Sequence, residues 1–182
     1  MDLTIDQPIF AMEETVESKW KHKYALFVEE HADDVEWREV GDNSNLSMKL
    51  VIKYFKNSLY MYVVSKNPAI TLEHIEKYPD MGWEWDGISR NPNLTMEFVD
   101  KYPDKPWCWN GISYNNNVSM EFIEKHPDKP WDWEWIGTST NLTVEFLEKY
   151  LDKPWDWSIV SFNPNLTIEF VDKHSSTPWN WF

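Results

Sequence analysis

Four aspartates recur along the chain at a constant spacing of 24 residues: Asp80, Asp104, Asp128 and Asp152. Carboxylates gathered in one place could bind Ca²⁺, which takes oxygen ligands at ~2.3–2.6 Å. Packed helical layers are ~8–10 Å apart, so a single ion could not bridge equivalent carboxylates of neighbouring layers. We therefore expect these aspartates to serve turns or helix caps, and we predict neither a metal site nor a cofactor.

The single cysteine, Cys108, could be a nucleophile, but it occupies a repeated position at which other residue types also occur: Glu84, Asp132, Asp156 and Asn180. We expect a solvent-facing substitution there. His126 and His174 replace tyrosines of the same repeated pattern, which predicts packing roles for both. The sequence contains no phosphate-binding loop, dinucleotide-binding fingerprint, HExxH zinc motif or nucleophile elbow. We predict that the protein is not an enzyme.

The charge balance bears on the class of partner. The 182 residues contain 17 Lys and Arg against 31 Asp and Glu, a net charge of −14. Nucleic-acid binding draws its affinity from positive charge, so we expect no nucleic-acid partner. No apolar run approaches ~18 residues, the N-terminus lacks a signal pattern, and one cysteine cannot form an internal disulfide. We expect an intracellular, soluble protein with no membrane partner.

An internal repeat organises the 13 tryptophans. Alignment of the chain on itself at a spacing of 24 residues gives six units: 43–66, 67–90, 91–114, 115–138, 139–162 and the shorter 163–182. Residues 1–42 follow the pattern only faintly, and we expect them to form an N-terminal cap, either a degenerate repeat or an irregular segment. The repeat is the main guide to the fold.

The first half of each unit predicts a short helix. We number the positions of a unit from 1; positions 4 and 9 are always aliphatic, position 11 is always Lys, and position 12 is aromatic or His. Positions 8, 9 and 12 have the spacing of one helix face. Position 5 is always Ser or Thr, which caps a helix by accepting from unpaired backbone N–H groups. We predict a helix of about eight residues, followed by prolines such as Pro103 and Pro127.

The second half of each unit carries two columns of tryptophan. The first tryptophan column, at position 17, comprises Trp83, Trp107, Trp131, Trp155 and Trp179. The second tryptophan column, at position 19, comprises Trp85, Trp109, Trp133, Trp157 and Trp181. A second helix opened by Pro106 and its equivalents would point these two columns ~200° apart. We expect the second column to join Ile88, Ile112, Ile136 and Val160 in the core, and the first to lie flat between adjacent units.

Two short helices cannot bury enough apolar surface alone, so the units are predicted to stack into an all-α solenoid. The order Asn-Pro-Asn-x-Thr-x-Glu-x-aliphatic, a second short helix and a further Asn-Pro resembles the leucine-rich variant repeat. The residues that match that family's pattern are Asn91, Pro92, Asn93, Thr95, Glu97, Val99, Tyr102, Asp104 and Ile112. The resemblance implies a right-handed superhelix whose second helices are 3₁₀. The chain has Trp-x-Trp where that family has Val-Arg and lacks the family's cluster-binding cysteines, so no iron–sulfur site is expected.

The wording of the repeats has a second resemblance. Phrases such as NPNLTMEFVDKYPDKPWCW are similar to tandem repeats in uncharacterised proteins of giant DNA viruses of amoebae, over roughly residues 67–182. This resemblance implies a virus-encoded protein, placed in the host cytoplasm or the virion, and implies no particular activity.

A repeat without a catalytic constellation predicts a non-catalytic scaffold that binds another protein. We expect contacts from exposed edges of the first column and from Trp135, which lies outside both columns. The first-column candidates are Trp83, Trp107, Trp131 and Trp155, for which packing between units is the alternative role.

A basic patch is a further candidate for binding. Lys49, Lys53 and Lys56 could recruit an acidic partner or the acidic flank of a second copy, which would give self-association; a solvated face is the alternative. Two other function classes stay open: a structural component of a virion or another assembly, and carbohydrate binding on flat tryptophan platforms.

Overall fold

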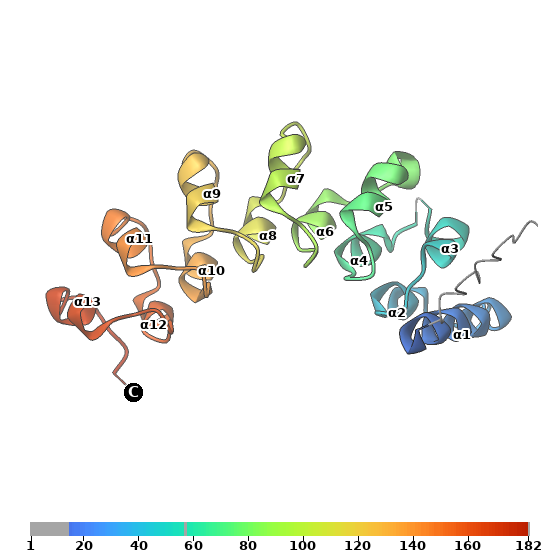
Figure 1. The fold of residues 1–182 in the computed structure, drawn as a ribbon, viewed down its shortest axis with the longest axis horizontal. Coiled ribbons are helices and arrows are strands. Elements are labelled where there is room, and N and C mark those ends of the chain that lie inside the picture. The colour runs from blue at the N-terminus through green and yellow to red at the C-terminus, as the bar shows by residue number, and fades with distance from the viewer. Residues whose placement is uncertain (1–14, 57, 182) are drawn as a thin grey trace, which may run out of the picture.

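The computed structural model describes residues 15–56 and 58–181, and this part of the chain is all-α, without a strand (Figure 1). It starts with the long helix α1 (Val16–Glu30). The first helices of the units are α3 (Met48–Leu50) with the π-helix η1 (Val51–Phe55), α5 (Leu72–Lys77), α7 (Met96–Lys101), α9 (Met120–Lys125), α11 (Val144–Lys149) and α13 (Ile168–Lys173). The second helices are α2 (Trp37–Asp42), α4 (Met61–Lys66), α6 (Trp85–Ser89), α8 (Trp109–Ser113), α10 (Trp133–Thr138) and α12 (Trp157–Val160).

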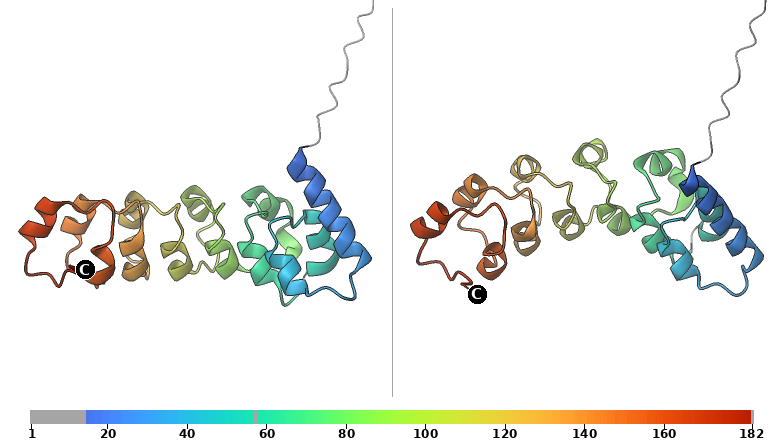
Figure 2. Two further views of the ribbon diagram at one scale, coloured as in Figure 1. Left: turned by 90° about the horizontal axis from the view of Figure 1, so that it is seen from below. Right: turned by 60° about the horizontal axis from the view of Figure 1, so that its bottom comes forward.

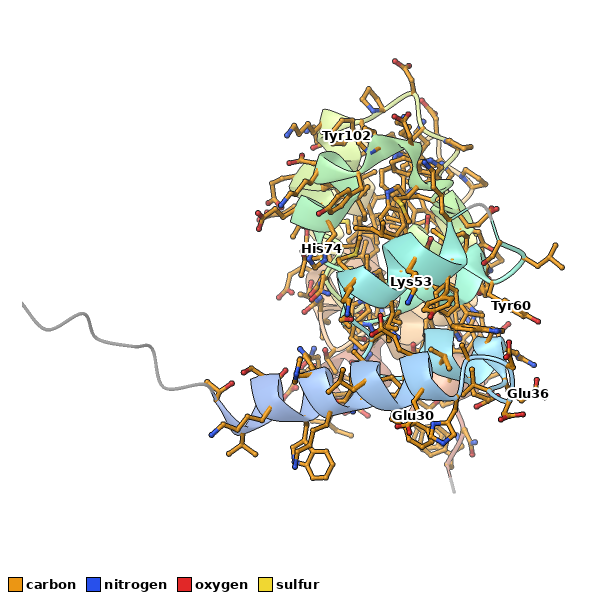
Figure 3. The ribbon with its side chains drawn as sticks, turned by 90° about the vertical axis from the view of Figure 1, so that its right-hand side faces the viewer. Glu30, Glu36, Lys53, Tyr60, His74 and Tyr102 are labelled. Carbon is orange, nitrogen blue, oxygen red and sulfur yellow. The ribbon has the colours of Figure 1, made fainter. Side chains whose placement is uncertain are left out.

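The units stack side by side into an arched rod that is two helices thick (Figures 1 and 2). Helices α5, α7, α9, α11 and α13 form the outer, convex row, and α4, α6, α8, α10 and α12 form the inner, concave row. Helix α1 lies across one end of the rod (Figure 3). The predicted all-α solenoid of two-helix units is confirmed, whereas the handedness of the superhelix stays a prediction. No helix in the described ranges is long and apolar enough to cross a membrane.

The Ser or Thr of position 5 caps the first helix, as predicted. In α7 the hydroxyl oxygen of Thr95 accepts from the backbone N–H of Phe98 at 3.3 Å. The helix has six residues rather than about eight, because Tyr102 leaves the helical conformation (φ −124°, ψ 60°). A residue that precedes proline disfavours the α region, and Pro103 follows here. Tyr150 ends α11 in a similar way with Leu151 after it, so proline is not the only cause.

The second helices begin later than predicted, and they are α-helices rather than 3₁₀-helices. Helix α8 starts at Trp109 because the residue before it, Cys108, is extended (φ −87°, ψ 97°) and forms the N-cap. The prediction that Pro106 and its equivalents open this helix is therefore wrong. Within the described residues, 3₁₀ geometry is confined to η2 (Pro79–Met81), which lies before α6. The residue between the two tryptophans is thus a helix cap.

The two tryptophan columns have the reverse of the predicted roles. The first column is buried, 6–8% exposed, and its indole N–H groups donate to the carbonyl at the end of the first helix, as from Trp107 to Tyr102 at 2.9 Å. The second column is half-buried, and its last member, Trp181, is exposed. The prediction failed because it placed both tryptophans on one helix, whereas the first lies in the extended segment before it. Position 22 is core as predicted, with Ile88, Ile112, Ile136 and Val160 all fully buried.

Buried asparagines at position 1 bond successive units together. The side-chain nitrogen of Asn91 donates to three backbone oxygens at 2.8, 3.0 and 3.1 Å, those of Ser65, Asn67 and Ile70. Its side-chain oxygen accepts from the backbone N–H of Asn93 at 2.8 Å, which closes the turn that the Asn-Pro-Asn sequence predicts. The same residue therefore shapes its own turn and holds the backbone of the preceding unit. Equivalent inter-unit bonds come from Asn67, Asn115 and Asn163.

Positions 3 and 23 add further links of the same kind. Position 3 donates to the carbonyls of positions 2 and 4 of the preceding unit at 2.8–3.0 Å, through Asn93, Asn117, Asn141 and Asn165. At position 23, the hydroxyl of Ser89 donates to the carbonyl of Trp85 and accepts from the backbone N–H of Cys108 at 3.0 Å. The side-chain amides and hydroxyls thus form a polar, hydrogen-bonded contact between successive units.

The joint between units 115–138 and 139–162 lacks two of these links. Position 1 is Ser139, which keeps the turn by accepting from Asn141 at 3.1 Å, and position 23 is Gly137. Among the described residues, no side chain donates to the carbonyls of Ser113 and Asn115, which an asparagine at position 139 would reach. This joint is therefore held by fewer hydrogen bonds than its neighbours.

Replacing Asn91 by alanine should lower the free energy of unfolding by about 2–4 kcal/mol, because buried carbonyls lose their donor. Urea unfolding followed by far-ultraviolet circular dichroism measures the change. Asn116→Ala is the matched control: its side chain is exposed and makes no bond within the described residues, so its effect should stay within ~0.5 kcal/mol. Equal losses in the two variants would contradict the proposed ladder.

The opposite change, Ser139→Asn, should raise the free energy of unfolding by about 1 kcal/mol, because it supplies the missing donor to Ser113 and Asn115. Ser44→Asn, at an exposed position 2, is the control and should leave the unfolding midpoint unchanged. A midpoint for Ser139→Asn at or below that of the parent chain would show that this joint does not accept the ladder.

Candidate partner-binding surfaces

The first tryptophan column, predicted to offer exposed edges to a partner, is not at the surface. Trp83, Trp107, Trp131 and Trp155 are each 6–8% exposed, and their N–H groups are bonded inside the chain. The expectation of exposed edges is wrong for this column. The alternative considered from the sequence, packing within and between units, describes what these four rings do.

Each half-buried tryptophan of the second column packs edge-to-face against the buried tryptophan of the next unit. The ring centroids are 4.9 Å apart for Trp85 and Trp107 and 5.2 Å apart in the next three pairs. A Phe at position 8 and a Tyr or His at position 12 complete a group of four rings, which we call an aromatic box. The boxes are Trp85, Trp107, Phe98 and Tyr102; Trp109, Trp131, Phe122 and His126; Trp133, Trp155, Phe146 and Tyr150; and Trp157, Trp179, Phe170 and His174.

The second-column indole is the accessible member of each box. The ammonium of Lys105 lies over the Trp85 ring at 5.0 Å, and that of Lys129 lies over Trp109 at 4.9 Å, in cation–π contacts. Within the described residues no acceptor pairs with the indole N–H of Trp85 or Trp109, and neither nitrogen is both buried and unpaired. These N–H groups are therefore unpaired and not fully enclosed, whereas the first-column N–H groups are already bonded. The same holds for Trp133.

Two cavities beside successive boxes have equivalent linings. One of about 110 Å³ is lined by Ile75, Glu76, Pro79, Trp83, Trp85, Tyr102 and Lys105, together with Phe98. The next, of about 200 Å³, is lined by Val99, Asp100, Pro103, Trp107, Trp109, His126 and Lys129. The second set is the first set moved by one unit of 24 residues. The stacking therefore repeats a small, partly apolar recess along the rod.

A ladder of charges runs beside these cavities. The lysine at position 11 pairs with the carboxylate at position 10 of the preceding unit, as in Lys101 with Glu76 and Lys125 with Asp100, both at 2.6 Å. Position 12 joins the same carboxylate: Tyr102 donates to Glu76 at 2.9 Å, and His126 lies 2.8 Å from Asp100. The predicted packing role of His126 is therefore combined with a hydrogen bond to a carboxylate of the preceding unit. The Lys125 hydrogen bond, followed by that of His126, holds the pKa of Asp100 below its usual value.

The basic residues near the N-terminal end are largely paired within the chain. Lys49 and Lys53 share the carboxylate of Glu29 on α1, at 3.1 and 3.3 Å, and Figure 3 shows Lys53 above that helix. Lys56 is exposed and lines a cavity of about 270 Å³ with Lys77 and Asp80, among other residues. Recruitment of an acidic partner by these lysines stays a prediction. The pairing of Lys49 and Lys53 with Glu29 reduces the positive charge that they could offer to such a partner.

Trp135 is at the surface, as predicted. It is 38% exposed on α10 and meets Tyr114, 55% exposed, edge-to-face with ring centroids 4.7 Å apart. In α6 the equivalent residue is Gly87, where a Cβ would lie only 2.6 Å from the carbonyl oxygen of Tyr62. Helix α10 thus carries an indole at a position where α6 needs glycine for close approach and α12 has Ile159. We call Tyr114 and Trp135 the aromatic pair.

Cys108 is an N-cap rather than a solvent-facing substitution. Its Sγ accepts from the backbone N–H of Gly111 at 3.4 Å, and the guanidinium of Arg90 lies 3.9 Å away. Burial, and after it a hydrogen bond with Asp86, raises the pKa of the thiol, which disfavours the reactive thiolate. Asp132 and Asp156 cap the following second helices with their carboxylates, which explains the residue types at this position.

No group of His, Cys, Asp and Glu side chains suited to holding a metal ion occurs in the described ranges. The four aspartates at position 14 are exposed; Asp104, Asp128 and Asp152 lie in turns between helices, and Asp80 lies in η2. Comparison with known proteins gave no match to a family model, to a curated protein or to a solved structure. The chain is therefore described by its own features: tryptophan-rich repeated short helices with periodic aromatic clusters.

The charge ladder predicts a pH-dependent contribution to stability. Because the folded pKa of Asp100 is lowered, its stabilisation is fully present above the unfolded pKa of about 3.9 and is lost as the pH falls through the lower folded value. Asp100→Asn should cost up to ~1 kcal/mol at pH 7, since the pair is partly exposed, and nothing at about pH 2. Asp172→Asn, at the same position of the last unit and without an ion pair in the described residues, is the control. A pH-independent cost for Asp100→Asn would contradict this account.

Proposed function

We propose that the chain is a non-catalytic repeat scaffold that binds another protein through the inner face of its arch. The aromatic pair is the observation that carries the proposal, because two large exposed rings, one in α10 of the inner row and one at the C-cap of α8, pack on each other. Phe162, 68% exposed, occupies position 24 of unit 139–162, the position that Tyr114 occupies in unit 91–114.

Physical reasons support a binding role for this pair. Trp and Tyr are enriched among residues whose truncation weakens protein–protein association most, since they bury large areas at low entropy cost. The pair joins Tyr114, the C-cap of α8, to Trp135 of α10, in the unit that is followed by the joint lacking two inter-unit hydrogen bonds. A chain selected only for stability would gain from an asparagine at position 139 and has no structural need for an exposed indole at position 135. Partner binding would explain the exposed indole of Trp135, which packing within the chain does not explain.

The alternative functions receive less support. Carbohydrate platforms need open indole faces, whereas the first-column rings are buried and Trp85, Trp109, Trp133 and Trp157 of the second column are half-buried. A role as a structural component of a virion, and the viral origin that the repeat wording suggests, are proposals that mass spectrometry of purified particles would address. An intracellular location follows the same proposal.

Substitution of the aromatic pair tests the scaffold function. The double variant Tyr114→Ser/Trp135→Ser should lose at least ~90% of the specifically recovered partner when tagged chains are purified from the native cells and compared by quantitative mass spectrometry, because the hot-spot area is removed. Trp20→Ser, which removes an exposed tryptophan of α1, is the matched control and should keep the partner. Thermal unfolding within a few degrees of the parent chain confirms that the double variant is folded.

Equal recovery of the same proteins with the parent chain and with the double variant would remove the inner face from consideration. Loss of the partner in Trp20→Ser but not in the double variant would move the interface to α1.

A further inference from the structure

The row of aromatic boxes is a second surface, distinct from the aromatic pair. Two cavities beside successive boxes share the same lining types: an aliphatic residue, a proline, two tryptophans and a lysine. Equivalent recesses in successive units suit a chain-like ligand whose side chains recur at the same spacing. The repeat distance, the hydrogen-bonding groups and the charge then define that ligand.

The spacing of the boxes favours one ligand conformation over an extended strand. Neighbouring units are related by helix packing, which places equivalent points ~8–10 Å apart on the packed side. A polyproline II segment has three residues per turn and a rise of ~3.1 Å, so every third residue recurs after ~9.3 Å. A β-strand presents side chains on the same face every ~6.6–6.8 Å, which is shorter than the ~8–10 Å between neighbouring units, so its side chains would not match successive boxes.

The free indole N–H groups distinguish polyproline II from an α-helix, whose side chains seven residues apart have a similar spacing. Trp85, Trp109 and Trp133 each present an unpaired donor that is not fully enclosed, as described above. The carbonyls of an α-helix are used internally, whereas those of polyproline II make no internal hydrogen bonds and are available as acceptors. Proline also has no N–H of its own to satisfy, so a donor-rich surface suits it.

The size and charge of the recesses complete the ligand's description. Cavities of about 110 and 200 Å³ suit single small side chains, such as a proline ring or a short aliphatic group. Residues 67–182 carry 9 Lys and Arg against 19 Asp and Glu, a net charge of −10, and Glu76 and Asp100 stand at the recesses. Glu76 and Asp100 are paired with Lys101 and Lys125, so it is the net negative charge of residues 67–182 that basic residues beside the proline-rich stretch would complement.

We propose that the row of aromatic boxes binds a basic, proline-rich segment of another protein in the polyproline II conformation, with every third residue in a recess. The indole N–H groups of the second column donate to the segment's backbone carbonyls. Lys105 and Lys129, which are exposed, move aside from the indole faces that they cover. The boxes and the aromatic pair have no residue in common, so this site stands or falls independently of the aromatic pair.

Two displayed peptide libraries test the ligand class with the full chain. Both span ~12 residues, about four polyproline II turns, with arginine at both ends; one fixes proline at every third position and the other fixes alanine there. The proline library should be enriched over the alanine library. A selected peptide, labelled with fluorescein, should then bind on the order of tenfold more weakly to Trp85→Phe/Trp109→Phe, which removes two donors and keeps aromatic rings. Trp135→Phe is the control and should bind like the parent chain.

Nitrogen-15 NMR of the indole N–H signals locates the site without relying on affinity. Titration with the selected peptide should shift the signals of Trp85, Trp109 and Trp133 and leave that of Trp135, which lines neither recess, in place. Equal enrichment of the two libraries would overturn the polyproline II ligand, and binding that leaves the second-column signals unmoved would overturn the site. Either failure, with the aromatic-pair result intact, would leave the scaffold proposal standing.

Discussion

The buried side-chain amide at position 1 is the interaction on which the rest of this structure depends. Helices of four to six residues leave nearly all of their end N–H and C=O groups without a partner inside the helix. Buried groups of that kind are costly unless they are hydrogen-bonded. The hydroxyl caps at position 5 satisfy N–H groups within a unit, and Asn91 and its equivalents satisfy carbonyls of the unit before. Stacking therefore completes the hydrogen bonding that each unit lacks when it is alone.

The indole pairs do for apolar surface what the asparagines do for polar groups. The first-column ring fills the unit from beneath its outer helix, and its N–H ties the extended segment to the end of that helix. The second-column ring closes the joint against the next unit and keeps one edge at the surface. Packing thus leaves a regular row of partly open aromatic sites. The joint between units 115–138 and 139–162 has fewer inter-unit hydrogen bonds than its neighbours. Trp135, two residues before Gly137, has an exposed indole.

Much of the fold could be predicted from the sequence because its signals are local and recur in each unit. The hydroxyl at position 5 and the aliphatic stripe each depend on residues that are close in the sequence, and they predict a helix. The 24-residue period shows that this helix recurs, which predicts stacked two-helix units. The burial of Trp107 rather than Trp109 could not be predicted from helix periodicity, since Trp107 lies in an extended segment. The bonds of Asn91 were missed because their acceptors lie 21 to 26 residues earlier and meet it only after stacking. Trp135 could be identified as a candidate from the sequence because it lies outside both tryptophan columns. The aromatic boxes could not be predicted, because each combines a tryptophan of one unit with three rings of the next unit.

Exchange of the asparagine side-chain amide hydrogens with D₂O, followed by NMR, tests the central claim most directly. If the amides of Asn67, Asn91, Asn115 and Asn163 hold the units together, their hydrogens should exchange as slowly as the backbone N–H of Ile88 and Ile112 in the core. The exposed side chain of Asn116 should exchange at the rate of a free amide in the same sample. Exchange of the position 1 amides as fast as that of Asn116 would show that the joints are open, and would contradict the account.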